Sequence, residues 1–342
     1  MELGYSDFSA ADATADMLLG RATSKAERRQ RYAYIATAAA GTVAALALIG
    51  FVAASPAVTT PTVATIMHDG IINAAEVKDD TIFDAAGRYI MKAYDRAKPM
   101  ASFLPGVGGL WGVPMWAFYV NRGQGMATFG IENKEGGLLL FQTAEKSYQA
   151  TANVGFRTLL KGTRKDGSFE AQPFFPESDA DAAHTAARTM YIGNNEMEVE
   201  EVDPDTDMTT NALYFNIPNE DFPALVRRVT YTNTGDSAVD LEVVDGLAKL
   251  EPAGTTTAML NAMGRTLEGW MHVYNFNTDH TAPFFHLVSA PADTADVVLI
   301  QDGHFAVAFV EDDSSLVSGK HELLPMICDQ QLLFGTDTTL TV

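Results

Sequence analysis

The sequence predicts a mainly β protein: a large antiparallel β-sandwich preceded by a single transmembrane helix and an amphipathic helix. Beyond Pro99, short runs rich in β-branched and aromatic residues alternate with turn signals such as Lys165-Asp166-Gly167. These runs do not alternate with helical segments, as the strands of a parallel βαβ sheet would. Upstream, residues 32–54 contain no charged side chain, which is typical of a membrane-spanning helix.

The residues before the sandwich divide into three segments. Residues 1–31 form a tail with five basic and five acidic side chains. Residues 32–54 are long enough to cross a bilayer, which takes about 20 apolar residues. Residues 55–79 begin with an uncharged run rich in Pro and Thr, which favours an extended stalk.

The charges around residues 32–54 predict the orientation of this signal-anchor helix. Four basic residues precede it, namely Lys25, Arg28, Arg29 and Arg31, and no Lys or Arg follows until Lys78. The positive-inside rule then places the N-terminus in the cytoplasm and the sandwich domain in a lumen or outside the cell. Two alternatives stay open: a signal peptide cleaved at Val52–Ser55, and an Ala-rich helix buried in a soluble protein.

Residues 80–342 are predicted to form the sandwich domain and its leading helix. Apolar residues between Thr81 and Ala97 recur every three or four positions, which predicts the amphipathic helix, and Lys98-Pro99 ends it. The acidic residues 173–187 are predicted to form a loop. Strands are predicted at Trp116–Asn121, Leu138–Gln142, Ala212–Ile217, Leu225–Asn233, Val239–Val244, Val297–Gln301 and His304–Val310.

The composition narrows the possible partners. The net charge of −21 at pH 7 makes nucleic acid an unlikely ligand, because such binding depends on neutralising phosphates. Cys328 is the only cysteine, so the chain forms no internal disulfide, and the residue is expected to be a small buried hydrophobe. The seven histidines share no ligand spacing, and we predict no metal or cofactor.

Two acidic motifs invite a functional interpretation. Asp203 to Asp207 has the D-x-D-x-D opening of a calcium loop, but Met208 and Tyr214 occupy the positions that require Gly and Glu. An acidic turn is therefore expected. Glu196, Glu198 and Glu200 share one face of a predicted strand, which could bind cations or sugar hydroxyls, or simply face solvent or another domain.

The polar run from Asn121 to Gly125 is the strongest candidate for a binding site. Asn121, Arg122 and Gln124 follow an apolar strand and are rich in hydrogen-bond donors, which suit sugar hydroxyls or an interface. The alternative is a hairpin turn in which Arg122 and Gln124 cap backbone groups.

Long stretches of the chain resemble one enzyme family. The resemblance extends over residues 82–342, and its core is F-L-P-G-V-G-G-L-W-G-V-P-M-W-A-F-Y-V-N-R-G-Q-G at 103–125. Further matching segments are Y-D-R-A-K-P at 94–99, A-T-F-G-I-E-N-K at 127–134, K-S-Y-Q at 146–149, G-F-R-T at 155–158, N-N-E-M-E-V-E-E-V at 194–202, T-N-A-L-Y-F-N-I-P-N-E-D-F at 210–222, L-V-R-R-V-T-Y-T-N-T at 225–234, L-E-V-V-D-G-L at 241–247, L-L-P-M-I-C-D at 323–329 and F-G-T-D at 334–337. In this order they resemble the N-terminal domain of inverting glycoside phosphorylases of glycoside hydrolase families 94 and 149, the cellobiose and β-1,3-glucan phosphorylase groups.

The resemblance implies a β-supersandwich that helps to build a homodimer and closes over the active site of a following (α/α)6 barrel. The family's barrel carries the catalytic Asp, and inorganic phosphate is the co-substrate that converts a β-glucan oligosaccharide to a sugar 1-phosphate. Because the sequence ends at Val342, before such a barrel, no catalytic residue is assigned, and whether the chain acts as an enzyme stays open. The expected function is that of a truncated or split phosphorylase. The alternative is a membrane-tethered, non-catalytic carbohydrate-binding or interaction module.

Overall fold

A computed structural model describes most of the predicted sandwich domain. The described residues are 82–107, 110, 112–176, 186–275, 281–288, 303–311, 321–329 and 331–337. The predicted tail, transmembrane helix and stalk at 1–31, 32–54 and 55–79 lie outside them, as does the strand predicted at Val297–Gln301. None of the helices in the described ranges is long and apolar enough to cross a membrane.

The described chain is mainly β, and every pair of its named strands is antiparallel, which confirms the predicted fold class at this level. A five-stranded sheet has the order β1 (Tyr89–Lys92), β7 (Ala187–Ile192), β8 (Glu196–Asp203), β9 (Met208–Asn216) and β10 (Leu225–Asn233). The three smaller sheets are β2 (Ala101–Val107), β3 (Met115–Val120) and β4 (Met126–Ile131); β11 (Asp240–Leu247), β5 (Phe156–Arg164) and β6 (Gly167–Ala171); and β12 (Met271–Tyr274), β13 (Phe284–Leu287) and β14 (His304–Phe305). The short helices are η1 (Lys134–Gly136), α4 (Ala144–Val154), α5 (Thr257–Met263), η2 (Gly264–Trp270) and α7 (Gln331–Phe334).

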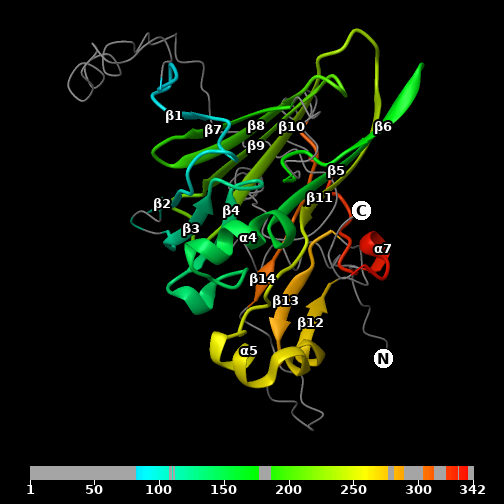
Figure 1. The fold of residues 1–342 in the computed structure, drawn as a ribbon. Coiled ribbons are helices and arrows are strands. Elements are labelled where there is room, and N and C mark those ends of the chain that lie inside the picture. The colour runs from blue at the N-terminus through cyan, green and yellow to red at the C-terminus, as the bar shows by residue number, and fades with distance from the viewer. Residues whose placement is uncertain are drawn as a thin grey trace, which may run out of the picture.

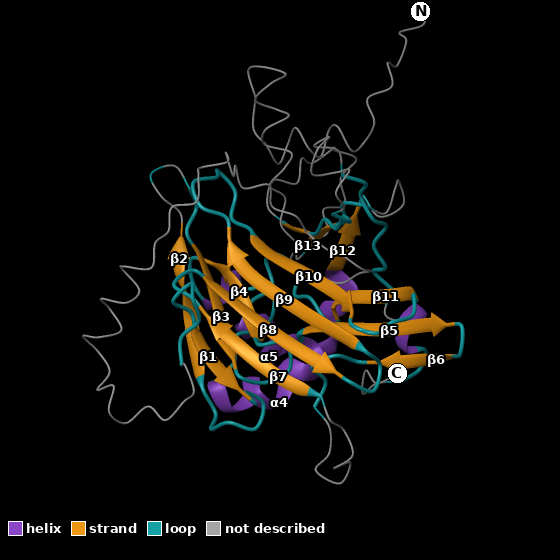
Figure 2. Cartoon of the chain, turned by 90° about the horizontal axis from the view of Figure 1, so that it is seen from above, coloured by secondary structure: helices purple, strands orange, loops and turns teal. Residues whose placement is uncertain are grey.

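All four sheets contribute to one hydrophobic core. Buried side chains such as Leu104 of β2, Phe156 of β5, Met197 of β8 and Phe285 of β13 belong to a single cluster. The β12–β13–β14 sheet and α5 lie at the opposite end of the molecule from β7 to β10 (Figure 1). Seen from above, β7 to β9 pass in front of α4 and α5 (Figure 2).

Alternation of side chains explains the central strands of the five-stranded sheet. Along β8, Met197, Val199 and Glu201 are buried, whereas Glu196, Glu198 and Glu200 are only partly buried. The predicted division of this strand into two faces is therefore confirmed. The next strand, β9, alternates in the same way, so each strand supplies one face to the core.

The link between β8 and β9 is the acidic turn expected from the sequence. The Asp203 carboxylate accepts hydrogen bonds from the Asp205 amide at 2.9 Å and the Thr206 hydroxyl at 2.8 Å. Asp207 has a φ of 53°, a conformation that Asp tolerates better than most residues. The carboxylate thus holds the turn together from within.

The amphipathic helix predicted between Thr81 and Ala97 is wrong, because the residues described there form a turn, strand β1 and a second turn. Gly87 and Ala93 adopt left-handed φ values of 79° and 48°, which interrupt a right-handed helix. The Asp84 carboxylate closes the first turn by accepting from the amides of Ala86 and Arg88. The apolar spacing instead serves edge strand β1 and the fully buried Tyr94.

Other predicted strands divide into those confirmed and those shortened or lost. The predictions at Trp116–Asn121, Ala212–Ile217, Leu225–Asn233 and Val239–Val244 correspond to β3, β9, β10 and β11. The strand predicted at Leu138–Gln142 is wrong, because this segment is irregular. Pairing with β4 stops after the Gly130–Gly137 bridge and the hydrogen bond from the Leu138 amide to the Phe129 carbonyl oxygen. Of His304–Val310 only β14 is a strand, and α4 and α5 were not predicted.

Replacing Gly130 with Ala should destabilise the protein by about 1–3 kcal/mol, because the new Cβ would lie 2.2 Å from the Gly136 carbonyl oxygen and 2.7 Å from the Gly137 Cα. Urea unfolding measures the change. Gly167→Ala is the matched control, since nothing lies within 4 Å of its Cβ. Equal stability of the two variants would contradict the close packing at Gly130.

Candidate functional site

A buried polar network lies where three of the sheets meet. Its centre is the ion pair between Arg227 of β10 and Asp245 of β11, whose side chains are only 4% and 2% exposed. The other members are Tyr214 of β9, Tyr231 of β10, Thr158 of β5 and Gln124 of the turn between β3 and β4. We refer to these six residues as the Arg227–Asp245 network.

Both oxygen atoms of the Asp245 carboxylate accept hydrogen bonds from members of the network. Arg227 donates through Nη1 to Oδ1 and through Nη2 to Oδ2, the latter at 3.0 Å. Oδ2 also accepts from the Thr158 hydroxyl at 2.7 Å and the Tyr231 hydroxyl at 2.9 Å. A buried carboxylate is stable only when it is paired in this way.

The guanidinium of Arg227 has further partners besides Asp245. Its Nη2 donates to Gln124 Oε1 at 2.5 Å, and its Nε donates to the Tyr214 hydroxyl at 3.1 Å. The guanidinium carbon also lies 4.8 Å from the centre of the Phe156 ring, a cation–π contact. Gln124 Nε2 donates to Thr158 Oγ1 at 2.8 Å, which closes the network.

The network holds its protons over the ordinary pH range. Burial raises the pKa of Tyr214 to about 12, although Arg227 opposes the shift. Burial and the neighbouring Asp245 raise the pKa of Tyr231 well above 10. Burial alone would lower the pKa of Arg227, but the Asp245 carboxylate outweighs it and raises this pKa. The arrangement therefore suits a structural clamp better than proton transfer, which requires a pKa near the working pH.

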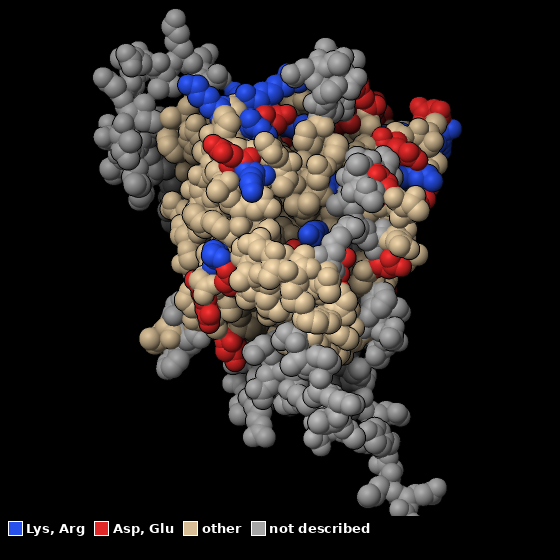
Figure 3. Space-filling model, turned by 60° about the horizontal axis from the view of Figure 1, so that its bottom comes forward, with Lys and Arg blue, Asp and Glu red and all other residues tan. Residues whose placement is uncertain are grey.

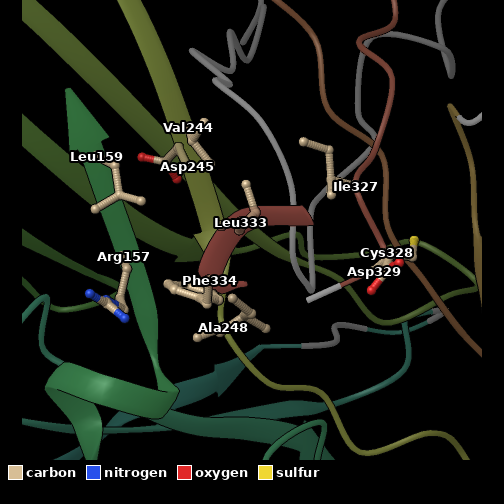
Figure 4. A pocket seen from close by; sticks show the side chains of 12 residues that line it. Arg157, Leu159, Val244, Asp245, Ala248, Ile327, Cys328, Asp329, Leu333 and Phe334 are labelled. Atoms are coloured by element: carbon tan, nitrogen blue, oxygen red, sulfur yellow. The ribbon is translucent and has the colours of Figure 1, made fainter. Parts of the chain in front are cut away.

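A cavity of about 70 Å³ lies beside the network, between β5, β11 and the residues around α7. Leu333 and Phe334 of α7 face it from one side and Leu159 from the other (Figure 4). Arg157, also in its lining, donates to Gln172 Oε1 at 3.0 Å and lies about 5 Å from the rings of Phe175 and Phe334. Small-molecule sites usually measure about 300–1,000 Å³, so this cavity is a packing space under α7.

A second buried ion pair fixes the other end of the five-stranded sheet. Arg188 Nε of β7 donates to Glu201 Oε2 of β8 at 2.6 Å, and the same oxygen accepts from the Phe174 amide at 2.7 Å. Arg188 also contacts Asp95 at 3.2 Å. Burial raises the pKa of Glu201, although Arg188 acts against the shift.

The structure places Asn121, Arg122 and Gln124 in a hairpin turn and engages each side chain. Asn121 is fully buried; its Oδ1 accepts from the Met100 amide at 2.8 Å and its Nδ2 donates to the Tyr94 carbonyl at 2.9 Å. Arg122 donates to the same Tyr94 carbonyl at 3.3 Å and is partly exposed. Gln124 belongs to the Arg227–Asp245 network. Arg122 thus caps backbone groups as the hairpin-turn interpretation expects, whereas Gln124 bonds to side chains instead. A binding or interface role for the three residues stays a prediction.

The row of glutamates on β8 is also engaged. Glu198 Oε2 pairs with Arg88 Nη1 at 2.5 Å, and Asn211 Nδ2 donates to both Glu198 and Glu200 at about 3 Å. In the described ranges, no three or more His, Cys, Asp or Glu side chains group together as a metal site would require. Cys328 is half-buried, and burial raises the pKa of its thiol to about 11, so it is a poor nucleophile at neutral pH.

An aromatic cluster that includes three residues of the 103–125 segment reaches the surface. Phe103 of β2 is 49% exposed and packs against Trp116, Phe118 and Phe141, with ring centres 4.8–6.4 Å apart. We call these four residues the Phe103 cluster. It combines apolar area with a surface position, which is typical of interaction sites.

Sequence reasoning identified Gln124 but missed the rest of the network. Arg227 and Asp245 stand at inward positions of strands whose neighbours are apolar, in L-V-R-R-V and L-E-V-V-D. A charge at an inward strand position is a signal of a buried pair, because an unpaired one would be too costly. The partner is a residue 18 positions away on another sheet, which the pattern alone does not give.

Comparison of the sequence with protein-family models and with curated proteins gives no match. The resemblance to glycoside phosphorylases therefore rests on the sequence segments quoted above.

Replacing Asp245 with Ala should lower the free energy of unfolding by about 3–5 kcal/mol, because Arg227 would be left buried without its counter-charge. The double variant Arg227→Met, Asp245→Ala should cost far less than the sum of Arg227→Met and Asp245→Ala alone. Urea unfolding of the four proteins gives the coupling energy. Lys134→Ala, which removes a largely exposed partner of Glu135, is the control and should change stability by about 0–1 kcal/mol. Additive single changes would show that the pair is not a unit.

Stability should fall as the pH rises from about 10 to about 12, because Tyr214 ionises near 10 in the unfolded chain and near 12 in the folded one. The raised pKa stabilises the fold fully below pH 10 and is lost as the pH rises through 12. For Tyr214 the loss is roughly 2–3 kcal/mol. Urea midpoints between pH 8 and 12 measure it, and Tyr214→Phe should flatten the alkaline decline. An unchanged slope in that variant would count against the assignment.

Proposed function

We propose that this chain is the N-terminal sandwich domain of a β-glucan phosphorylase and serves assembly and active-site closure for an (α/α)6 catalytic barrel. In this reaction, inorganic phosphate attacks a β-glucan oligosaccharide and releases a sugar 1-phosphate. The catalytic acid and the phosphate site are assigned to the barrel. The residues described here act as the scaffold and a contact surface.

One observation carries the proposal: segments that resemble the family, far apart in sequence, converge in the Arg227–Asp245 network. Gln124 belongs to the segment at 103–125, Thr158 to 155–158 and Tyr214 to 210–222. Arg227 and Tyr231 belong to 225–234, and Asp245 to 241–247. The resemblance thus includes the residues that hold the sheets together, as expected if the likeness is one of domain architecture.

The chemistry of the described residues also favours a supporting role. The Arg227–Asp245 network is sealed and its protons are fixed, and the cavity beside it is far smaller than a sugar-binding site. One face of the molecule carries few charged side chains across its middle (Figure 3). A weakly charged face suits an uncharged partner, such as a glycan or the surface of another domain.

A second function is favoured by the Phe103 cluster, whose exposed ring could stack on a sugar or contact an apolar partner. In this alternative the chain is a membrane-tethered, non-catalytic module that binds β-glucan or a protein by itself. The two functions differ in whether a catalytic barrel is required.

A chimera tests the proposal. Residues 80–342 replace the sandwich domain of a β-1,3-glucan phosphorylase, and release of sugar 1-phosphate from β-1,3-gluco-oligosaccharides and phosphate is measured. We expect the chimera to exceed the isolated barrel by at least tenfold, because positioning and closure contribute this much or more to rates.

Two further measurements separate the alternatives. Within the chimera, Arg122→Ala should change dimerisation or oligosaccharide affinity, whereas Arg122→Lys keeps the charge and serves as its control. Binding of β-gluco-oligosaccharides by the full chain alone, abolished by Phe103→Ala, would favour the tethered module. A folded chimera no more active than the barrel, combined with no glucan binding by the full chain, would overturn both functions.

A further inference from the structure

The β12–β13 ladder brings two histidines face to face. His272 of β12 is paired directly with His286 of β13 in antiparallel register, so both side chains point to the same side of the sheet. The Cβ atoms of such opposite residues lie about 4.5–5.5 Å apart. Neither residue was linked to the other by sequence spacing, because they stand on different strands.

One ring nitrogen of the pair has no hydrogen-bond partner among the described residues. The His272 residue is exposed, and its ring lies 6.0 Å from that of Tyr274. The His286 Nδ1 atom is buried and has no hydrogen-bond partner in the described part of the chain. A buried polar atom without a partner requires an explanation, and a bound ion or water is a common one.

Two aromatic residues of the ladder lie next to the pair on the same face of the sheet. Tyr274 is paired with Phe284 in the next register position on the same face, with ring centres 6.4 Å apart. His304 lies on the opposite face, since it is paired with Phe285, and its Nδ1 is engaged by the Glu251 carbonyl oxygen at 2.9 Å. The site therefore consists of two imidazoles beside an aromatic surface.

Two neutral imidazoles that can converge are typical ligands of Zn²⁺, Ni²⁺ and Cu²⁺, with metal–nitrogen distances of about 2.0–2.1 Å for zinc. The register places both side chains on one face at opposite strand positions, so a rotamer change can bring both rings to one ion, and water completes the coordination. The net charge of −21 attracts cations to the protein in general. Hard ions such as Mg²⁺ prefer oxygen ligands and are disfavoured here.

We propose that His272 and His286 form a two-histidine site for a divalent transition-metal ion, which cross-links β12 to β13. The ladder contains only four residue pairs, and a short ladder gains more from a cross-link than a long one. Binding would stabilise the small sheet that follows α5 and η2. This inference is independent of the proposed role in glucan phosphorolysis.

The test is titration of the full chain with Zn²⁺ or Ni²⁺ at pH 7.5, followed by calorimetry and by thermal unfolding. We expect one site per chain and a rise in Tm of several degrees at saturating metal, since ligands that bind only the folded state raise its stability. Mg²⁺ should have no such effect.

Three variants decide the assignment. His272→Ala and His286→Ala should each lower the affinity roughly tenfold or more, since each removes one of the two ligands. His184→Ala, which removes a histidine distant in sequence, is the matched control and should bind as the parent does. His272 is exposed, so its variant should keep the parent's Tm in EDTA and remain interpretable if His286→Ala fails to fold. Parent-like metal binding by His272→Ala, or no binding by the parent chain, would overturn the proposal.

Discussion

The architecture depends on one buried ion pair. Arg227 and Asp245 are removed from water almost completely, and each would be prohibitively costly alone. Their bonds to Gln124, Thr158, Tyr214 and Tyr231 satisfy the remaining donors and acceptors, and so fix the relative position of three sheets. Apolar packing can tolerate small shifts between sheets, whereas a charged network in a low-dielectric interior has few acceptable geometries.

The second ion pair complements this arrangement on two inner strands of the five-stranded sheet. Arg188 and Glu201 connect β7 and β8 to the residues around Phe174 and Asp95. The two pairs lie on different strands, so the large sheet is held by charges at separate points and by the common core between them. The turn carrying Asn121 and Gln124 lies between the two ion pairs. Gln124 bonds to Arg227. On the other side, the Tyr94 hydroxyl donates to the Gly123 carbonyl oxygen at 2.5 Å, and the next residue, Asp95, contacts Arg188.

Most of the central strands could be predicted from the sequence, whereas most residues of the buried network could not. Strands β9, β10 and β11 were predictable because β-branched and aromatic residues cluster between clear turn signals. The helix expected near Thr81 failed because a spacing of three to four also arises where turns bracket a short strand, and Gly87 and Ala93 decide that outcome through their φ values. Gln124 was identified for its donors, but its partner Arg227 lies 103 residues away and depends on the tertiary fold.

That separation has a consequence for how the chain folds. Contacts between residues distant in sequence slow folding, because the intervening loop must be ordered before the contact can contribute. Arg227 meets Gln124 across 103 residues and reaches its counter-charge only when β11 is available. During synthesis, a nascent chain that has not yet extended to Asp245 would have to bury Arg227 unpaired. We therefore expect the central sheets to complete their packing only after Asp245 has left the ribosome, and the edge of β10 to stay open to other chains until then.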